Sequence, residues 1–324
     1  MKNVEALRFC ERCVYVFGLG LKNPANGEII NAKMLGQQCL CDLCHDGKMA
    51  SVKNSKDYFK KQMTSYLEDK KRVLFAYSGG LDSTAVLFLL KKECLKHKIE
   101  LVTFTINHGY KGIQALDNIK NVIDYLKVNH FWSDISLNKI GSEGQTVLQK
   151  YKQCFCDKIL PCGKICNSMI DEEYSKIMQE LSFSELITGG DTPKKNELGD
   201  YSIFWKKPSG LVIIRGGWAF GLTKDLNNSI IKDNNIPWIR PDCGGYDTDC
   251  LLPGAFFREA LSGDNKIGLK KIAATFPIIF DYLAERVRFG IINREHALEM
   301  LEKIDIGSKE NYFELQEIFR ILKS

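Results

Sequence analysis

Four cysteines near the start of the chain have the spacing of metal-binding hooks. They form two Cys-x-x-Cys pairs, Cys10 with Cys13 and Cys41 with Cys44. Four thiolates in a tetrahedral arrangement are the ligands that structural zinc prefers, at Zn–S distances of about 2.3 Å. We therefore predict that these four residues bind Zn²⁺. Cys39 is an alternative ligand and His45 a weaker one, and the remaining alternative is a set of free thiols in a loop-rich lobe.

A second group of cysteines lies in the middle of the chain. It consists of Cys154, Cys156, Cys162, Cys166, Cys243 and Cys250. The thiolate is the form of cysteine that binds metals and attacks other groups, and Lys164 with a helix N-terminus nearby would lower the pKa of a thiol here. This group therefore predicts metal binding or thiol chemistry. Cys94, by contrast, lies in an amphipathic pattern and is expected to pack in the core.

A glycine turn follows the first strongly apolar run of the central region. The segment SGGLDS, residues 78–83, ends that run and is followed at once by a helical pattern. Glycine allows close approach of the backbone, and a helix N-terminus attracts anions. Ser78, Ser83 and Thr84 add hydroxyl donors, and Asp82 could hold a cation or order the loop. The pattern predicts a backbone turn that binds an anion, and the alternative is a tight strand-to-helix turn without a ligand. The segment matches neither the Walker phosphate-binding loop nor the GxGxxG motif of dinucleotide-binding proteins.

The segments around this turn alternate between strands and helices. Short apolar runs predict strands at residues 72–77, 100–106, 130–136 and 184–190. Apolar spacing of three and four predicts helices at residues 82–97, 111–127, 168–181 and 223–234. The alternation is typical of an α/β fold with a doubly wound parallel sheet, which binds ligands at the carboxyl ends of its strands.

Composition and charge favour a protein with a sizeable core and an ordinary charged surface. The chain has 324 residues, is 44% hydrophobic and has a formal charge of +5, which allows an anionic substrate. No apolar stretch is long enough for a membrane span and no secretory signal is evident, so we expect a cytoplasmic location. The predicted regions are a zinc-binding lobe (1–50), a helical linker (51–70), the α/β domain (71–254) and a helical C-terminal region (255–324), with Asn293 as a helix N-cap.

The segment SGGLDS resembles the pyrophosphate-binding motif SGGxDS of the PP-loop, or N-type, ATP pyrophosphatases, with all five fixed positions matched. The resemblance implies an adenine nucleotide alpha hydrolase-like domain that cleaves ATP to AMP and pyrophosphate with Mg²⁺. It also gives Asp82 a place in catalysis. The positions that it assigns to binding pyrophosphate are Ser78, Gly79, Gly80, Asp82 and Ser83, with the Thr84 hydroxyl beside them.

Three later segments also resemble nucleotide-binding parts of this superfamily. They are FTINHG after the second strand, ELITGGDTPKKNE, and GLTKDL at a helix start. Gly190 stands where relatives usually have His or Glu, and Arg215 is a further candidate for gripping phosphate. The alternatives are a turn-capping role for Asp191 and a solvated Lys224. The resemblance points to Thr105, Ile106 and Asn107 for adenine, to Thr188, Gly189 and Asp191 for phosphate or magnesium, and to Lys224 for phosphate.

The central cysteines resemble those of the PP-loop tRNA thiolases. In that branch a CxxC pair and a later third cysteine hold a [4Fe-4S] cluster with one open iron for sulfide. The corresponding residues here are Cys162, Cys166 and Cys250, with Cys243 nearby. Because three residues rather than two separate Cys162 from Cys166, the thiols could instead carry a persulfide without a cluster, or be structural.

These features predict an ATP-dependent sulfurtransferase. A substrate carbonyl oxygen would be adenylated, and sulfur from an Fe–S cluster or a cysteine persulfide would then replace AMP. The sulfur donor would be sulfide or a cysteine desulfurase, and the acceptor a tRNA or a small molecule. Relatives suggest a homodimer formed through the helical C-terminal region.

Two other functions remain open. The segments FCERCV and VRFGIINREHALEML resemble the N-acetyl sugar amidotransferases, which would transfer ammonia to an adenylated substrate. A separate glutaminase subunit would supply the ammonia, because residue 2 is Lys2 and not the cysteine nucleophile of that class. The third possibility is a zinc-containing nucleic-acid-binding protein that keeps the ATP fold, which the modest charge disfavours.

Overall fold

The computed structural model describes the chain in segments separated by gaps. The described residues are 8–17, 31–45, 56–138, 140, 144–157, 160–163, 165–195, 200–241, 250–261, 270, 272–273, 276–302 and 312–323. None of the helices in these segments is long and apolar enough to cross a membrane.

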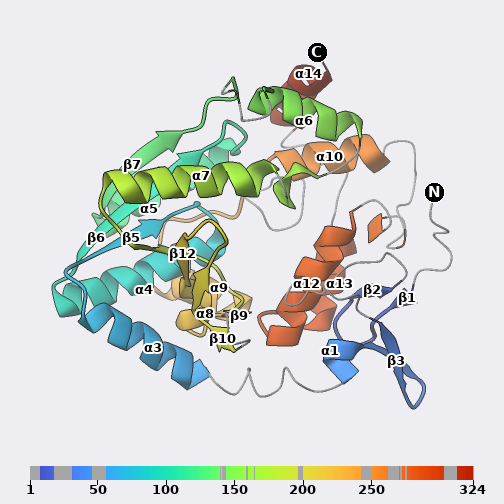
Figure 1. Ribbon diagram of the computed structural model, residues 1–324, viewed down its shortest axis with the longest axis horizontal. Coiled ribbons are helices and arrows are strands. Elements are labelled where there is room, and N and C mark those ends of the chain that lie inside the picture. Colours follow the sequence, from blue (N-terminus) through green and yellow to red (C-terminus); the bar gives the residue numbers. More distant parts are fainter. Residues whose placement is uncertain are drawn as a thin grey trace.

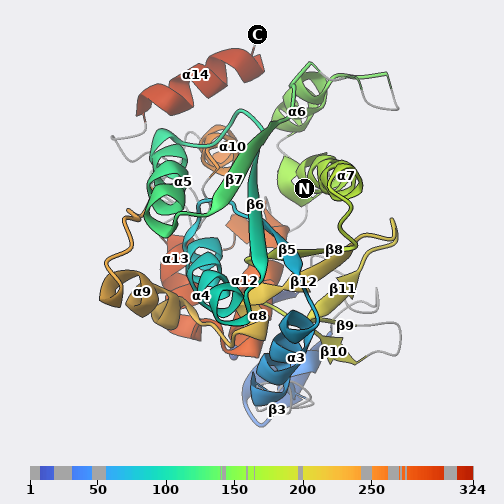
Figure 2. The same ribbon diagram turned by 90° about the vertical axis from the view of Figure 1, so that its left-hand side faces the viewer.

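A six-stranded sheet forms the centre of the described structure (Figures 1 and 2). Its strands lie in the order β11-β12-β8-β5-β6-β7, and all are parallel except β11, which pairs antiparallel with β12. The bounds are β5 (Arg72–Ala76), β6 (Glu100–Asn107), β7 (Asn129–Asp134), β8 (Glu185–Thr188), β11 (Phe204–Lys206) and β12 (Val212–Arg215). The four strands predicted from apolar runs correspond to β5, β6, β7 and β8.

Helices cover both faces of this sheet. Val73 and Phe75 of β5 face one core, together with residues of α3, α4, α5, α8 and α9. Leu74 and Ala76 of the same strand face the other core, with residues of α6, α7, α10, α12, α13 and α14. The alternation arises because successive side chains of a strand point to opposite faces. The predicted α/β class with a mostly parallel, doubly covered sheet is confirmed.

The helices predicted from apolar spacing are present. Residues 82–97, 111–127, 168–181 and 223–234 correspond to α4, α5, α7 and α9. The C-terminal region predicted to be helical contains most of α10 and all of α12, α13 and α14, whereas α6 was not predicted. Asn293 caps α13 as expected, because its Oδ1 accepts from the N–H of His296 at 2.7 Å. The bounds are α3 (Lys56–Glu68), α4 (Leu81–His97), α5 (Ile113–Leu126), α6 (Val147–Cys156), α7 (Ile165–Glu180), α8 (Gly216–Ala219), α9 (Lys224–Asp233), α10 (Leu252–Leu261), α12 (Pro277–Phe289), α13 (Arg294–Glu302) and α14 (Tyr312–Lys323).

Short hairpins build a small lobe near the N-terminus. The hairpins are β1 (Arg8–Phe9) with β2 (Val16–Phe17) and β3 (Ala32–Leu35) with β4 (Gln38–Cys41), and α1 (Asp42–His45) follows. The lobe lies beside α12 (Figure 1), and the ring centroids of Phe9 and Phe280 are 5.7 Å apart. Its buried residues belong to the same core as those of α12. The boundaries of the four predicted regions stay predictions.

The sheet reverses its direction of winding between β5 and β8. From β5 the chain proceeds to β6 and β7 on one side, and it later returns to β8 on the other side. The carboxyl ends of parallel strands at such a switch point form a crevice that binds ligands. The glycine turn at residues 78–83 follows β5, and residues 189–192 follow β8, so both predicted nucleotide segments face this crevice.

Candidate functional site

The turn after β5 requires glycine at residue 79. Gly79 has φ of +87°, a backbone conformation that L side chains rarely adopt. A Cβ at this position would lie 2.6 Å from Cγ1 of Ile119, so the turn approaches α5 too closely for any side chain. Trp238 holds the turn by donating from Nε1 to the carbonyl oxygen of Gly79 at 2.8 Å.

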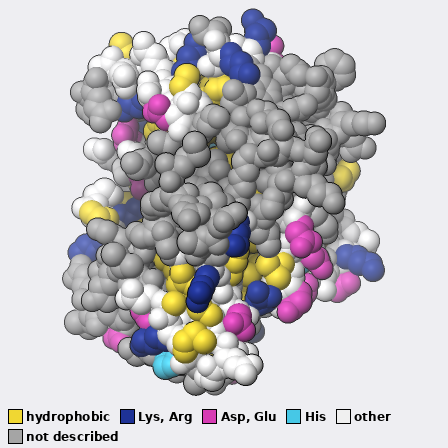
Figure 3. Space-filling model, turned by 90° about the vertical axis from the view of Figure 1, so that its right-hand side faces the viewer, with side chains coloured by type: hydrophobic (Ala, Val, Ile, Leu, Met, Phe, Trp, Pro, Cys, Tyr) yellow, Lys and Arg dark blue, Asp and Glu magenta, His cyan; other side chains and the backbone are white. Residues whose placement is uncertain are grey.

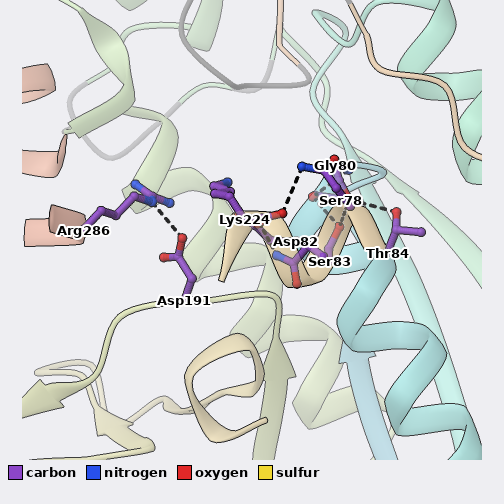
Figure 4. A network of polar contacts seen from close by, with 10 residues as sticks. Ser78, Gly80, Asp82, Ser83, Thr84, Asp191, Lys224 and Arg286 are labelled. Carbon is purple, nitrogen blue, oxygen red and sulfur yellow. Dashed lines mark hydrogen bonds and ion pairs between the residues drawn. The ribbon is translucent and has the colours of Figure 1, made fainter. Parts of the chain in front are cut away.

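The hydroxyl groups of the turn form one network (Figure 4). The Oγ atoms of Ser78 and Ser83 are 2.9 Å apart, and the Thr84 hydroxyl donates to the carbonyl oxygen of Gly80 at 2.8 Å. Gly80 is also the N-cap of α4, and no side chain caps that first turn. Because residues of this turn line the crevice, its N–H groups are available to an anion there.

Asp82 is held by two residues of α9. Its Oδ2 accepts from Nζ of Lys224 at 2.7 Å, and its Oδ1 accepts from Nδ2 of Asn227 at 2.7 Å. Lys224 is 6% exposed and lies in the first turn of α9, which Thr223 caps. The structure therefore brings together the acid of the loop and the lysine that were singled out separately in the sequence.

A cavity of about 850 Å³ connects these groups to the end of β8. The end of β8 approaches the start of α4 closely at Gly189, because a Cβ at this residue would lie 2.8 Å from Cα of Ser83. Eight of the predicted site residues line the cavity: Ser78, Gly80, Asp82, Ser83, Thr188, Gly189, Asp191 and Lys224. The roles of these residues in binding nucleotide stay predictions.

Asp191 is paired with an arginine from the C-terminal region. Its Oδ2 accepts from Nε of Arg286 on α12 at 2.7 Å, and the two residues are 3% and 5% exposed. Burial alone would raise the pKa of Asp191, but the positive charges of Arg286, Lys224 and Arg215 outweigh it and hold the pKa below its ordinary value. Asp191 is therefore an ionised group within the cavity wall.

Arg215, at the end of β12, accounts for the glycine at residue 190. A Cβ on Gly190 would lie 2.3 Å from Cζ of Arg215, so the guanidinium takes the space that a side chain would need. Arg215 donates from Nε to the carbonyl oxygen of Thr192 at 3.0 Å and from Nη2 to its Oγ1 at 3.3 Å. In this chain a cation therefore stands beside the position where resembling sequences usually carry His or Glu.

Charged and aromatic cavity residues were missed in the sequence, among them Asp171, Trp205, Lys207 and Arg286. Nζ of Lys207 pairs with the carboxylate of Asp171 and lies 4.5 Å from the centroid of the Trp205 ring. Trp205 and Lys207 come from the edge strand β11 and its end, Asp171 from α7, and Arg286 from α12. None of these elements carries a nucleotide motif. The alternation of an aromatic residue and a cation at 205 and 207 was the available signal.

The residues predicted to contact adenine lie away from the cavity wall. Thr105 is fully buried, and its hydroxyl donates to the carbonyl oxygen of Tyr77 at 2.7 Å. Asn107 donates from Nδ2 to Oδ1 of Asp134 at 2.9 Å. Neither residue lines the cavity, and Ile106 does not line it either. Their contact with adenine stays a prediction that the cavity does not support.

Three central cysteines come together where α7 begins. Cys162 and Cys166 are close enough for each thiol to shift the pKa of the other, and Cys250 also affects the pKa of Cys162. The hydroxyl of Tyr151 is 3.3 Å from Sγ of Cys166. The Cys162 thiol lowers the pKa of Cys166 below its ordinary value, whereas the Cys166 thiol and burial raise the pKa of Cys162. Burial, with the charges of Cys250 and Cys166, raises the pKa of Tyr110 to about 12.

This thiol cluster, defined as Cys162, Cys166 and Cys250, borders the cavity through α7. Cys166 lies in the first turn of α7, and the next residue, Asn167, lines the cavity together with Asp171. Thiolates are the usual ligands of iron–sulfur clusters, and three of them leave one iron without a protein ligand. The donor set therefore fits the predicted cluster in its chemistry.

The other cysteines of the central region differ in exposure. Cys156 is exposed on α6, and Cys154 is partly buried there. Cys94 is 1% exposed in α4 and packs in the core as expected. Cys243 and Lys164, which the sequence placed near the thiol cluster, lie outside the described residues.

The four predicted zinc ligands converge in the N-terminal lobe. The Sγ atoms of Cys10, Cys13, Cys41 and Cys44 all lie within 4.8 Å of one another, and all four residues are buried. A tetrahedral site with Zn–S bonds of about 2.3 Å has edges of about 3.8 Å. The Sγ atoms of Cys13 and Cys41 are 3.6 Å apart, which fits such a site. Neither Cys39 nor His45 belongs to this group, and Zn²⁺ as its metal stays a prediction.

A protein-family comparison addresses the central region directly. The family described as the PP-loop domain matches residues 51–150, which include the glycine turn. The chain contains a PP-loop domain. The resemblance of SGGLDS to the motif of this superfamily is thereby confirmed.

Two curated relatives of this chain are similar at moderate identity. An uncharacterized protein of Methanocaldococcus jannaschii is 27% identical over 252 residues, which are 76% of this chain and 78% of that protein. The tRNA(Ile)-lysidine synthase of Streptococcus sanguinis is 26% identical over 132 residues, which are 40% of this chain and 30% of the synthase. The similarity to the synthase therefore spans less than a third of its length.

Two solved structures are similar only at a distance. One is the U34-tRNA thiolase NcsA from Methanococcus maripaludis with its [4Fe-4S] cluster, at 14% identity, 90% coverage of both chains and a TM-score of 0.43. The other is phosphoadenylyl-sulfate (PAPS) reductase from Candida auris in a phosphate complex, at 13% identity, 64% coverage of this chain, 91% of the other and a TM-score of 0.38. Neither likeness is close enough to carry an argument about function.

Proposed function

We propose that the protein is an ATP-dependent, AMP-forming sulfurtransferase. The observation that carries the proposal is the position of the thiol cluster beside the nucleotide cavity. Cys166 lies in the first turn of α7, and Asn167 of the same turn lines the cavity that Ser78 and Asp82 also line. Sulfur transfer requires a sulfur nucleophile held close to an activated carbon. The PP-loop domain supports ATP as the activating substrate.

In the first step, a carbonyl oxygen of the acceptor attacks the α-phosphorus of ATP. The bond from this phosphorus to the bridging oxygen breaks, and pyrophosphate leaves with the electron pair. The hydroxyls of Ser78 and Ser83 and the first-turn N–H groups of α4 would hold the pyrophosphate as its charge develops. Lys224 would neutralise part of that charge, and Asp82 is the residue that would hold Mg²⁺.

In the second step, sulfur displaces AMP from the activated carbon. The thiol cluster would hold a [4Fe-4S] cluster, whose chemistry is to supply sulfide. A carbon–sulfur bond forms, the carbon–oxygen bond breaks, and AMP leaves with the former carbonyl oxygen. Tyr151, whose hydroxyl is 3.3 Å from Sγ of Cys166, would orient that ligand.

A persulfide transferred to Cys166 from a cysteine desulfurase, which supplies sulfur already at the persulfide oxidation level, would use the same residues without a cluster. Its terminal sulfur would attack the carbon, and Cys162 would then lose its proton and cleave the S–S bond. This leaves a Cys162–Cys166 disulfide, which an external thiol must reduce before the next turnover. The lowered pKa of Cys166 suits a carrier of this kind. Mass spectrometry after one turnover without reductant would detect the disulfide in the persulfide route alone.

The acceptor that we propose to test first is tRNA. The relative from Streptococcus sanguinis is named as a tRNA(Ile)-lysidine synthase, which supports this choice. Small carbonyl compounds are the alternative acceptors. The sulfur donor would be sulfide or a cysteine desulfurase.

The proposal also includes Zn²⁺ in the N-terminal lobe, a homodimer as the oligomeric state, and a cytoplasmic location.

The test uses anaerobically purified protein with ATP, Mg²⁺, radiolabelled sulfide and bulk tRNA. We expect AMP and labelled tRNA in equal amounts, and about four irons per chain if the cluster is present. The Cys166→Ser variant should lose labelling. Cys156→Ser removes an exposed thiol of α6 and should label tRNA at the wild-type rate. Wild-type labelling by the Cys166→Ser/Cys250→Ser variant would contradict the sulfur role of the thiol cluster.

Nitrogen transfer is the second candidate function. The segment that resembles an amidotransferase at the N-terminus lies against the C-terminal region, with Phe9 beside Phe280 at 5.7 Å. AMP formation that depends on ammonium and not on sulfide, together with co-purification of a glutaminase, would favour it. Absence of AMP formation combined with salt-sensitive binding of nucleic acid would favour the nucleic-acid-binding alternative.

A further inference from the structure

Arg286 has a buried nitrogen for which the described structure provides no hydrogen-bond partner, although its guanidinium lies over the ring of Tyr282. The residue is 5% exposed and lines the cavity, and its Nε donates to Asp191 at 2.7 Å. Its Nη1 is buried and makes no hydrogen bond to any described residue. A buried guanidinium N–H without a partner costs free energy, which an acceptor entering the cavity would offset. Arg286 is therefore poised to bind a ligand.

The charged side chains around Arg286 indicate that this ligand is an anion. Arg286 pairs with Asp191, and Nζ of Lys194 pairs with Oε1 of Glu285 at 3.0 Å. Arg215 lines the same cavity and makes its hydrogen bonds to Thr192, not to a carboxylate of the described chain. Three cations thus face two carboxylates, so this end of the cavity has an excess positive charge.

This positive end is separate from the glycine turn. In Figure 4, Lys224 lies between the turn with Ser78 and the pair formed by Asp191 and Arg286. Arg286 comes from α12 and Arg215 from the end of β12, and neither belongs to the PP-loop match at residues 51–150. An anion at Arg286 would therefore be a different group from the pyrophosphate held by the turn.

We propose that Arg286 and Arg215 form a second phosphate-binding subsite, across the cavity from residues 78–83. Guanidinium groups bind phosphate through strong, directional, charge-assisted hydrogen bonds. The phosphate would belong either to the AMP part of the nucleotide or to a phosphorylated acceptor. The inference rests on the nucleotide-binding part of the proposed function and is independent of sulfur transfer.

The test is a calorimetric titration of inorganic phosphate into the full-length protein saturated with magnesium pyrophosphate. Saturation fills the glycine turn, so phosphate that still binds must occupy another place. We expect phosphate to bind, and the Arg286→Gln variant to bind it roughly tenfold or more weakly, the loss typical of one charge-assisted hydrogen bond. Pyrophosphate should bind the variant as it binds the wild type, because the turn is unchanged.

A competition with AMP identifies the source of the phosphate. If AMP displaces inorganic phosphate from the pyrophosphate-saturated protein, the subsite takes the phosphate of the nucleotide. If AMP and inorganic phosphate bind together, the subsite takes a phosphate of the acceptor. Both outcomes support a second subsite and differ only in its occupant.

Two further variants keep the test decisive. Arg286→Gln leaves Asp191 buried without its partner, so Asp191→Asn/Arg286→Gln is titrated as well and should also lose phosphate binding. Arg320→Gln removes an exposed arginine of α14 and should bind phosphate as the wild type does. The subsite is overturned if pyrophosphate-saturated wild type binds no phosphate, or if the folded double variant binds it with wild-type affinity. Because no sulfur is used, failure of sulfur transfer would not affect these titrations.

Discussion

Nζ of Lys224 lies 2.7 Å from Oδ2 of Asp82, although 142 positions separate the two residues in the sequence. The contact joins the first turn of α4 to the first turn of α9, so two helix N-termini meet at one place. Each N-terminus has a partial positive charge that favours anions. A lysine and two helix ends around one carboxylate make this place suitable for a polyphosphate with its cation.

We expect Asp82→Asn to slow AMP formation by about a hundredfold or more, since the change removes a charge at the site where charge develops. The variant loses both the proposed ligand of Mg²⁺ and the ionic partner of Lys224. Release of pyrophosphate in the presence of ATP and acceptor measures the effect. Asp117→Asn changes an exposed residue of α5 and should have no effect. Equal rates for Asp82→Asn and wild type would exclude Asp82 from the reaction.

We expect Gly79→Ala to lower the free energy of unfolding by about 2 kcal/mol or more, because it combines a strained backbone with a steric clash. Gly79 has φ of +87°, and an added Cβ would lie 2.6 Å from Ile119. Denaturant unfolding, with the midpoint and slope both fitted, measures the change.

Gly210→Ala is the matched control for this substitution. Gly210 has φ of +86°, but nothing lies within 4 Å of an added Cβ. It should therefore show the backbone strain alone, and the difference between the two variants gives the cost of the clash. Equal destabilisation by both substitutions would show that α5 moves to accommodate the added methyl group, so that the steric clash costs no free energy.

The sequence predicted the parts of the fold that local patterns determine. The strand, turn and helix at residues 72–97 were predictable because an apolar run, two glycines and a helical periodicity are adjacent. Asp82 and Lys224 were both identified, but as members of separate motifs. Their contact depends on how α4 and α9 pack, which no local pattern encodes. The helical pattern of α12 alone did not indicate that Arg286 reaches the cavity.

The same limit explains why the residues predicted to contact adenine lie away from the cavity, whereas the four N-terminal cysteines converge as predicted. Thr105 was chosen because the resemblance places adenine near the end of this strand, but its hydroxyl donates to the carbonyl oxygen of Tyr77 at 2.7 Å. Successive side chains of a strand point to opposite faces of the sheet, so a shift of one residue in the predicted register places a side chain on the wrong face. A Cys-x-x-Cys pair is more informative than a single strand residue, because its short spacing places both thiols on one turn. Two such pairs, Cys10 with Cys13 and Cys41 with Cys44, were therefore enough to predict the group of four.

We expect acidification to destabilise the protein through His130. Burial lowers the pKa of His130 from 6.5 to about 4, and its Nε2 is buried without a partner among the described residues. Between these two values the unfolded chain binds a proton that the folded protein does not. The contribution of His130 to stability is therefore complete above pH 6.5 and is lost as pH falls from 6.5 to 4.

The loss should amount to about 2 kcal/mol, less than the full shift implies because the ring is partly open to solvent. Denaturant unfolding of wild type and His130→Gln at a series of pH values isolates this contribution as the difference between the two curves. Parallel curves over this interval would show that His130 is protonated alike in the folded and unfolded states.

We expect the N-terminal lobe to hold one tetrahedral metal ion per chain and to depend on it for its fold. The lobe has short hairpins and a small core, so the bonds to Cys10, Cys13, Cys41 and Cys44 would provide much of its stability. Elemental analysis should find one zinc per chain, and Cys10→Ser/Cys41→Ser should lose it. Cys39→Ser is the matched control, because Cys39 lies outside the group and this variant should retain the metal.

Removal of the metal should also increase amide exchange in α12, since Phe9 of the lobe packs on Phe280 of that helix. Full metal content in Cys10→Ser/Cys41→Ser would place the metal elsewhere.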